Sequence, residues 1–217
     1  MTAAALDVLT ATETKSGAIR GRIDREIEEV LATLPDPARL SAIERRGIIA
    51  RYTAVLEGNF IYWMTGAYLA AGSDQARAKI ADNLREEVRD CHPGMLRRFA
   101  VAASALPTDS DADAVSRSLA DVRLFIGRLS PVPIVVTMAF FEGFIQRFMA
   151  YLAELAGSQG SSEMEYTDVH GVCDVTHTEE LFRALDAELE LAPPLTEESM
   201  YEGVGLLRRL IADIAAA

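Results

Sequence analysis

Cysteine and histidine are scarce in this sequence, and their scarcity limits what the protein can be. Among 217 residues there are two cysteines, Cys91 and Cys173, and three histidines. Two cysteines cannot build a framework of several disulfides, so we expect reduced thiols and a cytoplasmic location. We interpret both cysteines as small, buried packing residues.

Positive charge is also in short supply. The chain has 21 Lys and Arg against 33 Asp and Glu, which gives a formal net charge of −12. Because no basic cluster is available to neutralise phosphates, the composition argues against binding of nucleic acid or of an anionic membrane surface. The first twenty residues lack the apolar core of a signal peptide. The longest apolar run, residues 131–141, has about half of the roughly 20 residues that a membrane span needs.

No segment alternates polar and apolar residues for long enough to predict a strand, whereas apolar residues recur every three or four positions along most of the chain. This pattern predicts helices over residues 16–34, 38–71, 74–90, 93–105, 114–128, 131–156, 165–191 and 196–214. We therefore expect an all-α fold, a single-domain compact helical bundle of seven to eight helices over residues 16–217, after a flexible tail at residues 1–15. Gly58 and Gly66 are expected at kinks or at close approaches between helices.

Two of the three histidines lie in the segment His170-Gly-Val-Cys-Asp174-Val-Thr-His177. A helix turns about 100° per residue, so Asp174 lies about 40° from His170 and His177 about 20° from it, and all three lie on one stripe. One helix can therefore offer three metal ligands without a distorted backbone. Mixed histidine and carboxylate ligands suit zinc, manganese or iron, and open coordination positions suit iron and oxygen chemistry. The competing interpretation is a solvated polar face that carries two surface histidines.

The third histidine, His92, follows Glu86 and Glu87 by six and five residues. On a regular helix Glu87 would lie about 140° away from His92. A π-bulge, with its i→i+5 spacing, would bring the two side chains together. We therefore prefer Glu87 to Glu86 as a ligand, although both glutamates could instead be solvated partners of Arg85 and Arg89.

Two further glutamates stand in apolar helical segments. A buried carboxylate at Glu142 costs several kcal/mol unless it is paired, protonated or bound to metal. Arg147, its nearest cation along the chain, lies five residues on and off its helical face, so metal ligation is the simpler interpretation. Glu57 could be another ligand, or it could orient one of the imidazoles by a hydrogen bond.

The separate candidates form a set of six donors from three predicted helices. They are Glu87, His92, Glu142, His170, Asp174 and His177. Six donors are too many for one catalytic metal with open positions. They suit two metals about 3.5–4 Å apart, and the core of a helical bundle is a known location for di-iron carboxylate sites.

The order of these residues resembles that of the haem-oxygenase-like di-iron oxidases and oxygenases, over about residues 45–190. The shared order is a glutamate, a histidine shortly after it, a lone glutamate about fifty residues on, and then His-x-x-x-Asp-x-x-His. The segment Asn83-Leu-Arg-Glu-Glu with His92-Pro-Gly-Met-Leu-Arg-Arg-Phe99 resembles that family's first ligand helix. The interval from Glu87 to His92 departs from the family pattern.

The resemblance implies a seven-helix haem-oxygenase-like fold without haem, two irons that assemble reversibly, and O2 as co-substrate. Family members oxidise small amines, amino acids or fatty acids by N-oxygenation, desaturation or C–C cleavage. In members that N-oxygenate, an additional glutamate from a core helix can complete the ligand set. Glu57 would fill that role here, which inclines the prediction toward N-oxygenation.

The prediction is thus an enzyme, a non-haem di-iron oxidoreductase that acts with two Fe(II) and O2 on a small, amino-acid-derived metabolite of specialised metabolism. Phe141 belongs to an apolar wall that would keep water from the oxidant, and Arg147 or Arg123 would hold a substrate carboxylate. The sequence has no flavin or nicotinamide fingerprint, so an external donor or the substrate would supply electrons.

Other functions and assemblies fit the same residues. One alternative is a metal-free enzyme of the same fold, either a thiaminase-like hydrolase or an oxidase that uses another cofactor. A second is a non-enzymatic helical protein that binds or stores metal. A homodimer is compatible with the amphipathic character of the first helix.

Overall fold

The computed structural model describes residues 16–192 and 195–216. These residues form eight α-helices and one short 3₁₀ helix, with no strand among them, which confirms the all-α compact bundle. The helices are α1 (Gly17–Ala32), α2 (Ala42–Ala70), α3 (Asp74–Arg89), α4 (His92–Ala102), α5 (Asp109–Ile126), α6 (Pro131–Ser158), α7 (Glu165–Leu191) and α8 (Glu197–Ala215), and η1 (Pro37–Arg39) is the 3₁₀ helix. The predicted tail at residues 1–15 lies outside the described residues.

Side-chain caps explain where several helices begin. Ser41 and Glu44 form a reciprocal capping box at the start of α2, and Ser73 accepts hydrogen bonds from the first turn of α3. Thr108 forms a second capping box with Asp111, so α5 begins at Asp109. The predicted start of this helix at residue 114 is therefore wrong, because this cap starts the helix five residues earlier.

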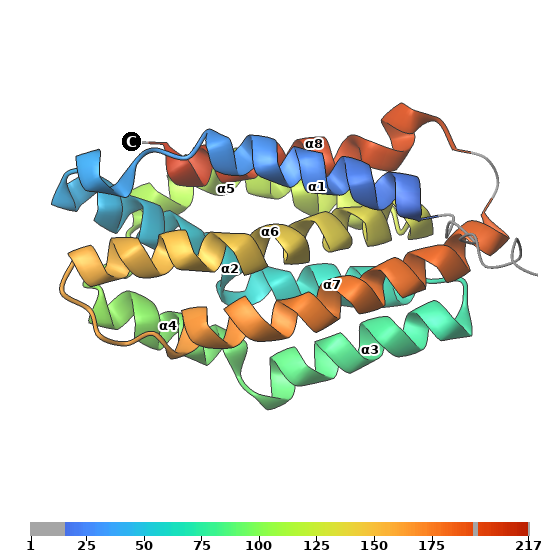
Figure 1. Cartoon of the computed structure of the whole chain (residues 1–217), viewed down its shortest axis with the longest axis horizontal. Coiled ribbons are helices and arrows are strands. Elements are labelled where there is room, and N and C mark those ends of the chain that lie inside the picture. The colour runs from blue at the N-terminus through green and yellow to red at the C-terminus, as the bar shows by residue number, and fades with distance from the viewer. Residues whose placement is uncertain (1–15, 193–194, 217) are drawn as a thin grey trace, which may run out of the picture.

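Helix α6 is the core of the bundle. Figure 1 shows it running through the middle of the molecule, with α1 and α8 along one side and α7 along the other. Its residues are buried on every side from Val132 to Ile145. The whole of α6 is long and apolar enough to cross a membrane, although the apolar run at residues 131–141 alone was judged too short. However, 89% of its most apolar stretch is buried inside the bundle. That burial is what packing in the core of the bundle requires.

Helix α2 contains both of the glycine features that the sequence predicts. Glu57 and Gly58 have non-helical backbone angles, so the helix is kinked there. At Gly66 the missing side chain makes room for Ile126 of α5. These two glycines set the path of α2 past the neighbouring helices.

The apolar face of α1 packs within the same chain. Ile19, Ile23, Ile27 and Val30 are buried, and α1 lies against α6. The apolar face of the amphipathic first helix is thus buried within one chain, and a homodimer stays a prediction.

Candidate metal centre

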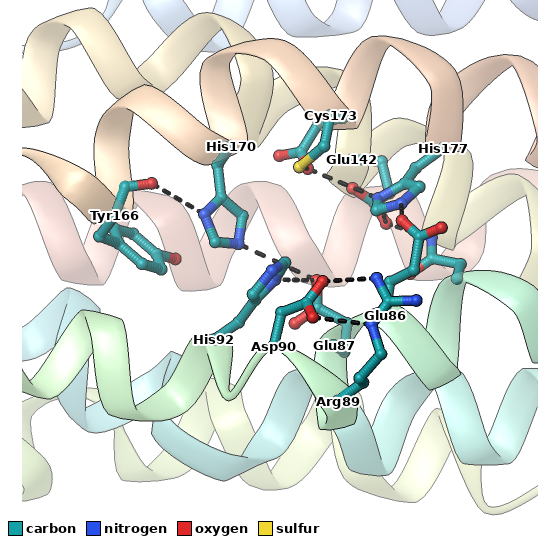
Figure 2. Close-up of polar contacts among 12 residues, drawn as sticks. Glu86, Glu87, Arg89, Asp90, His92, Glu142, Tyr166, His170, Cys173 and His177 are labelled. Atoms are coloured by element: carbon teal, nitrogen blue, oxygen red, sulfur yellow. Dashed lines mark hydrogen bonds and ion pairs between the residues drawn. The ribbon is translucent and has the colours of Figure 1, made fainter.

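Helix α7 presents the predicted histidine and aspartate stripe to the interior. His170, Asp174 and His177 are 5%, 0% and 3% exposed. Figure 2 shows His170 and His177 pointing from α7 toward α3 and the start of α4. The interpretation of this stripe as a solvated polar face is therefore wrong, because all three side chains are buried.

A break between α3 and α4 brings His92 to Glu87. Helix α3 ends at Arg89, and Cys91 adopts a left-handed conformation with φ of 55° and ψ of 47° before α4 begins at His92. The chain reverses the side-chain direction there, and His92 Nδ1 lies 2.7 Å from Glu87 Oε1. The predicted proximity is thus present, but a break between two helices produces it and a π-bulge does not.

The first group of donors consists of Glu87, His92 and His170. All three are buried, and their donor atoms lie within 4.8 Å of one another. His170 Nδ1 lies 2.8 Å from the carbonyl oxygen of Tyr166. Because a carbonyl oxygen only accepts hydrogen bonds, Nδ1 of His170 must carry the proton. The lone pair of Nε2 is therefore free to bind metal. That Nε2 faces Glu87 Oε1 at 3.9 Å.

The second group lies one to two turns further along α7. It consists of Cys173, Asp174 and His177, again with donor atoms within 4.8 Å of one another. His177 Nδ1 lies 3.6 Å from Asp174 Oδ1 and 3.7 Å from Glu142 Oε1. On the other side of the ring, Nε2 lies 2.9 Å from Glu86 Oε2. Glu86 thus orients His177, whereas the buried Glu87 belongs to the first group.

Glu142 of α6 connects the two groups. Its carboxylate lines the same recess as Glu87, His92 and His170, and it also faces His177 of the second group. Asn83 of α3 holds it in place, because Asn83 Nδ2 donates a hydrogen bond of 2.6 Å to Glu142 Oε1. Glu142 thus lies beside both groups that could hold metal.

The cluster is rich in negative charge and has no fixed positive partner. Its four carboxylates are Glu86, Glu87, Glu142 and Asp174, and no Lys or Arg among the described residues forms an ion pair with any of them. Glu87, Glu142 and Asp174 are buried, whereas the side chain of Glu86 is 45% exposed. Uncompensated carboxylates as deep as the first three are costly. Two divalent cations would neutralise the four charges.

Bound protons offset part of the negative charge of the cluster. Burial, together with the charge of Asp174, raises the pKa of Glu142 well above its usual range. For His177, burial lowers the pKa, but the carboxylates of Asp174, Glu142 and Glu86 outweigh it and raise the pKa to about 10. Burial opposes the charged form of His92 too, yet its hydrogen bond to Glu87 leaves the pKa raised. Cations entering the cluster would displace these protons.

The donor atoms fit metal ions in two independent respects. Asp174 Oδ2 and His177 Nδ1 are buried and have no hydrogen-bond partner, although such atoms are normally satisfied. Ligands bound to one ion at about 2.0–2.3 Å lie roughly 3–4 Å apart, which is the range of the His177 contacts to Asp174 and Glu142. The structure thus contains buried histidine and carboxylate groups that could hold metal.

The structure does not bring the remaining candidates to these groups. Glu57 lies at the kink of α2 and pairs with Arg97 at 2.8 Å. Arg147 forms ion pairs with Asp24 and Glu28 of α1. Phe141 is buried in the core, with its ring against Trp63 and Phe60, and it does not line the recess beside the first group. Arg123 is exposed and bonds to Asn59.

The recess beside the first donor group is mostly apolar. It is lined by Leu56, Phe60, Ile61, Pro93, Leu96, Ile145 and Tyr166, together with Glu87, His92, Glu142 and His170. Behind His170, the buried hydroxyls of Tyr52 and Tyr166 form a hydrogen bond of 2.8 Å, and the Tyr166 ring lies 4.2 Å from the His170 ring. Sequence analysis missed this tyrosine pair, because the two residues are far apart in the chain.

Of two nearer residues, Asn83 was missed and Cys173 was set aside because it lies roughly 60° from His170 around the helix. Asn83 lies four residues before Glu87, and Cys173 lies four residues before His177, so helical spacing places each beside a candidate ligand. The interpretation of both cysteines as buried packing residues is wrong. Cys91 is exposed and Cys173 is partly exposed, with its thiol turned to the Asp174 carboxylate.

Comparison with known proteins identifies no relative. No protein-family model, no curated protein and no solved structure matches the chain. The function proposed below is therefore supported by the geometry of the cluster and by the order of its donors along the chain.

Proposed function

We propose that this protein is a non-haem di-iron enzyme that uses O2 to oxidise a small, amino-acid-derived metabolite. The observation that carries the proposal is the pair of buried donor groups joined by Glu142, with four carboxylates and no fixed cation. The order of donors along the chain, which resembles that of the haem-oxygenase-like di-iron oxidases, supports the same function.

The two groups divide the ligands between two metals. Glu87, His92 and His170 would hold one iron, Asp174 and His177 would hold the other, and Glu142 would bridge them. Nitrogen and carboxylate donors of this kind suit iron. When bound, the irons supply the electrons and the coordination positions for reaction with O2.

Residues around the two groups orient the metal ligands and would exclude water. The carbonyl of Tyr166 fixes the tautomer of His170, Glu86 orients His177, and Asn83 positions Glu142. Such hydrogen bonds to ligands typically change metal affinity by about 10–100-fold. The apolar lining of the recess would exclude water next to the first group.

The alternatives have less support from the described residues. A thiol hydrolase needs a thiolate, but burial and the Asp174 carboxylate raise the pKa of the Cys173 thiol. Because Glu57 pairs with Arg97, the position of Glu57 gives no support to N-oxygenation over desaturation or cleavage. A protein that only stores metal would bind iron without consuming O2 in a substrate-dependent manner.

Single-turnover O2 consumption tests the proposal. Protein loaded anaerobically with Fe(II) would be mixed with O2 and a panel of amino acids, amines and fatty acids, with products identified by mass spectrometry. We expect one class to accelerate O2 consumption and to gain an oxygen atom, lose two hydrogens or lose carbon.

The variant His177→Ala should abolish the acceleration. Asp168→Asn, which changes an exposed carboxylate on the same helix, should leave it intact. If iron binds and no compound of the panel changes the rate or is altered, the oxidase proposal is wrong and a storage role is favoured.

A further inference from the structure

Cys173 stands out among the residues of the second donor group. Its Sγ lies 3.3 Å from Asp174 Oδ1, and its sulfur, an Asp174 oxygen and a His177 nitrogen all lie within 4.8 Å of one another. Figure 2 shows Cys173 on the same side of α7 as His170 and His177. We propose that Cys173 binds the second metal as a thiolate ligand. This inference rests on the metal centre proposed above and adds a ligand to it.

The helical register supports the assignment. Cys173 precedes His177 by four residues and follows His170 by three, so it shares their face of α7. Its angular offset of about 60° from His170 and about 40° from His177 places sulfur at one edge of the stripe, within reach of the same ion. Asp174 occupies the opposite edge, about 100° from Cys173, and His177 lies between them in angle, one turn further along the axis.

A second observation points to a ligand at this place. Asp174 Oδ2 and His177 Nδ1 are buried without hydrogen-bond partners, and their residues are 0% and 3% exposed. A Cys173 thiol that only fills space would leave Asp174 Oδ2 and His177 Nδ1 without a partner. A cation held by Cys173, His177 and both carboxylate oxygens of Asp174 would satisfy both atoms at once.

The separations are those of ligands around one ion. A thiolate binds Zn²⁺ at about 2.3 Å and an oxygen or nitrogen at about 2.0–2.2 Å, so neighbouring donors lie roughly 3–4 Å apart. The sulfur lies 3.3 Å from Asp174 Oδ1, and His177 Nδ1 lies 3.6 Å from the same oxygen. Little movement would be needed to bind a metal.

Thiolate binding would make the two metal positions chemically different. The first group offers two imidazoles and a carboxylate, whereas the second offers one imidazole, one carboxylate and sulfur. Sulfur favours thiophilic ions such as Zn²⁺, Fe²⁺ and Co²⁺ over Mn²⁺ and Mg²⁺. Formation of the metal–sulfur bond breaks the S–H bond, and the proton passes from the partly exposed thiol to solvent.

Cobalt substitution tests the inference, because a thiolate bound to Co(II) gives a near-ultraviolet charge-transfer band that nitrogen and oxygen ligands lack. The metal-free full chain would be titrated anaerobically with Co(II). We expect the visible bands of bound Co(II) together with the sulfur band. Cys173→Ser should lose the sulfur band, retain visible bands, and bind the second Co(II) at least about tenfold more weakly.

Cys91→Ser is the matched control, since Cys91 is exposed and belongs to neither donor group. It should behave as the wild type. A wild-type titration with two Co(II) bound and no sulfur band overturns the role of Cys173 and leaves the metal centre intact. Failure of Co(II) to bind at all overturns the metal centre itself.

A measurement on the wild-type chain covers the case in which Cys173→Ser does not fold. Alkylation of each cysteine would be followed by peptide mass spectrometry with and without Co(II). We expect Co(II) to slow alkylation of Cys173 by at least about tenfold while Cys91 reacts unchanged. Equal rates for Cys173 with and without bound Co(II) overturn the inference.

Discussion

At the scale of single residues, Glu142 carries the largest cost in the metal-free protein. It is 1% exposed, it lies near Asp174 and Glu87, and burial raises its pKa. Its only hydrogen-bond donor among the described side chains is Asn83. Residues held at such cost are commonly retained for function at the expense of stability.

Glu142→Gln should therefore stabilise the metal-free protein. We expect the free energy of unfolding to rise by about 1–3 kcal/mol at pH 8. The amide needs neither a buried charge nor a bound proton, and its oxygen can still accept the hydrogen bond from Asn83. The gain should disappear near pH 4, where the carboxyl is protonated in both the folded and the unfolded state. Urea unfolding of the wild type and the variant at the two pH values measures this gain in stability.

Glu188→Gln is the control for this experiment. Glu188 is 2% exposed, but its two carboxylate oxygens accept hydrogen bonds from the backbone N–H groups of Gly72 and Ser73. The amide has only one acceptor, so this variant should lose about 1–3 kcal/mol. A loss of stability in Glu142→Gln similar to that in Glu188→Gln would show that Glu142 is structural.

Protonation of His177 predicts how stability depends on pH. Its pKa is about 10 in the folded protein and about 6.5 when unfolded. A raised folded pKa contributes stability that is fully present below about 6.5 and is lost as the pH rises through about 10. The metal-free protein should thus lose stability between pH 7 and pH 10.

The variant His177→Gln should flatten this part of the stability profile. Thermal unfolding at several pH values measures the slope. An unchanged slope in His177→Gln would mean that other groups hold the protons in the cluster.

Sequence periodicity could predict the residues of one helix but not their partners. It identified His170, Asp174 and His177 because their spacing alone places them on one stripe. The choice between Glu86 and Glu87 required the direction of α3 relative to α7, since both glutamates contact histidines. Glu57 was misjudged for the same reason, because its partner Arg97 lies forty residues away.

At the scale of elements, glycines determine how closely the helices pack. Gly203 of α8 faces Phe125 of α5 and Thr137 of α6, and a Cβ built there would lie 2.5 Å from Phe125 Cε1. Gly205, two residues on, faces open space apart from the flexible end of Arg209 at 4.0 Å. The two positions share a helix and differ in their surroundings.

Alanine at these two positions should have opposite effects. Gly203→Ala should destabilise by about 1–3 kcal/mol, because α8 must move away from α5 and α6. Gly205→Ala should stabilise by about 0.5–1 kcal/mol through helix propensity. Chemical denaturation measures both, and destabilisation by both variants alike would contradict the close approach of α8 at Gly203.

The helix boundaries show what local signals can and cannot reveal. The bounds of α7 were predicted to the residue, since a glycine-rich loop precedes it and prolines follow it. The start of α5 was missed because the Thr108 and Asp111 cap lies within a polar stretch. The break between α3 and α4 was predicted from Pro93 and Gly94, but the left-handed backbone of Cys91 was not, because a non-glycine residue at φ of 55° depends on tertiary contacts.

At the scale of the whole molecule, the cluster depends on helices that are distant in sequence. Helix α7 packs against both α6 and α3, so buried donors between Glu87 and His177 meet in the interior (Figure 2). Composition and periodicity suffice for the fold class, because each amphipathic or apolar helix must bury its face. They do not determine which helices become neighbours.

Anaerobic titration of the metal-free protein with Fe(II) tests the central claim most directly, with bound iron counted after removal of free metal. We predict two irons per chain in the wild type and in Asp168→Asn. His177→Ala should bind one, because it removes a ligand of the second position and leaves Glu87, His92 and His170 intact. Binding of no more than one iron by the wild type, or of two by His177→Ala, would contradict a two-metal centre built from these groups.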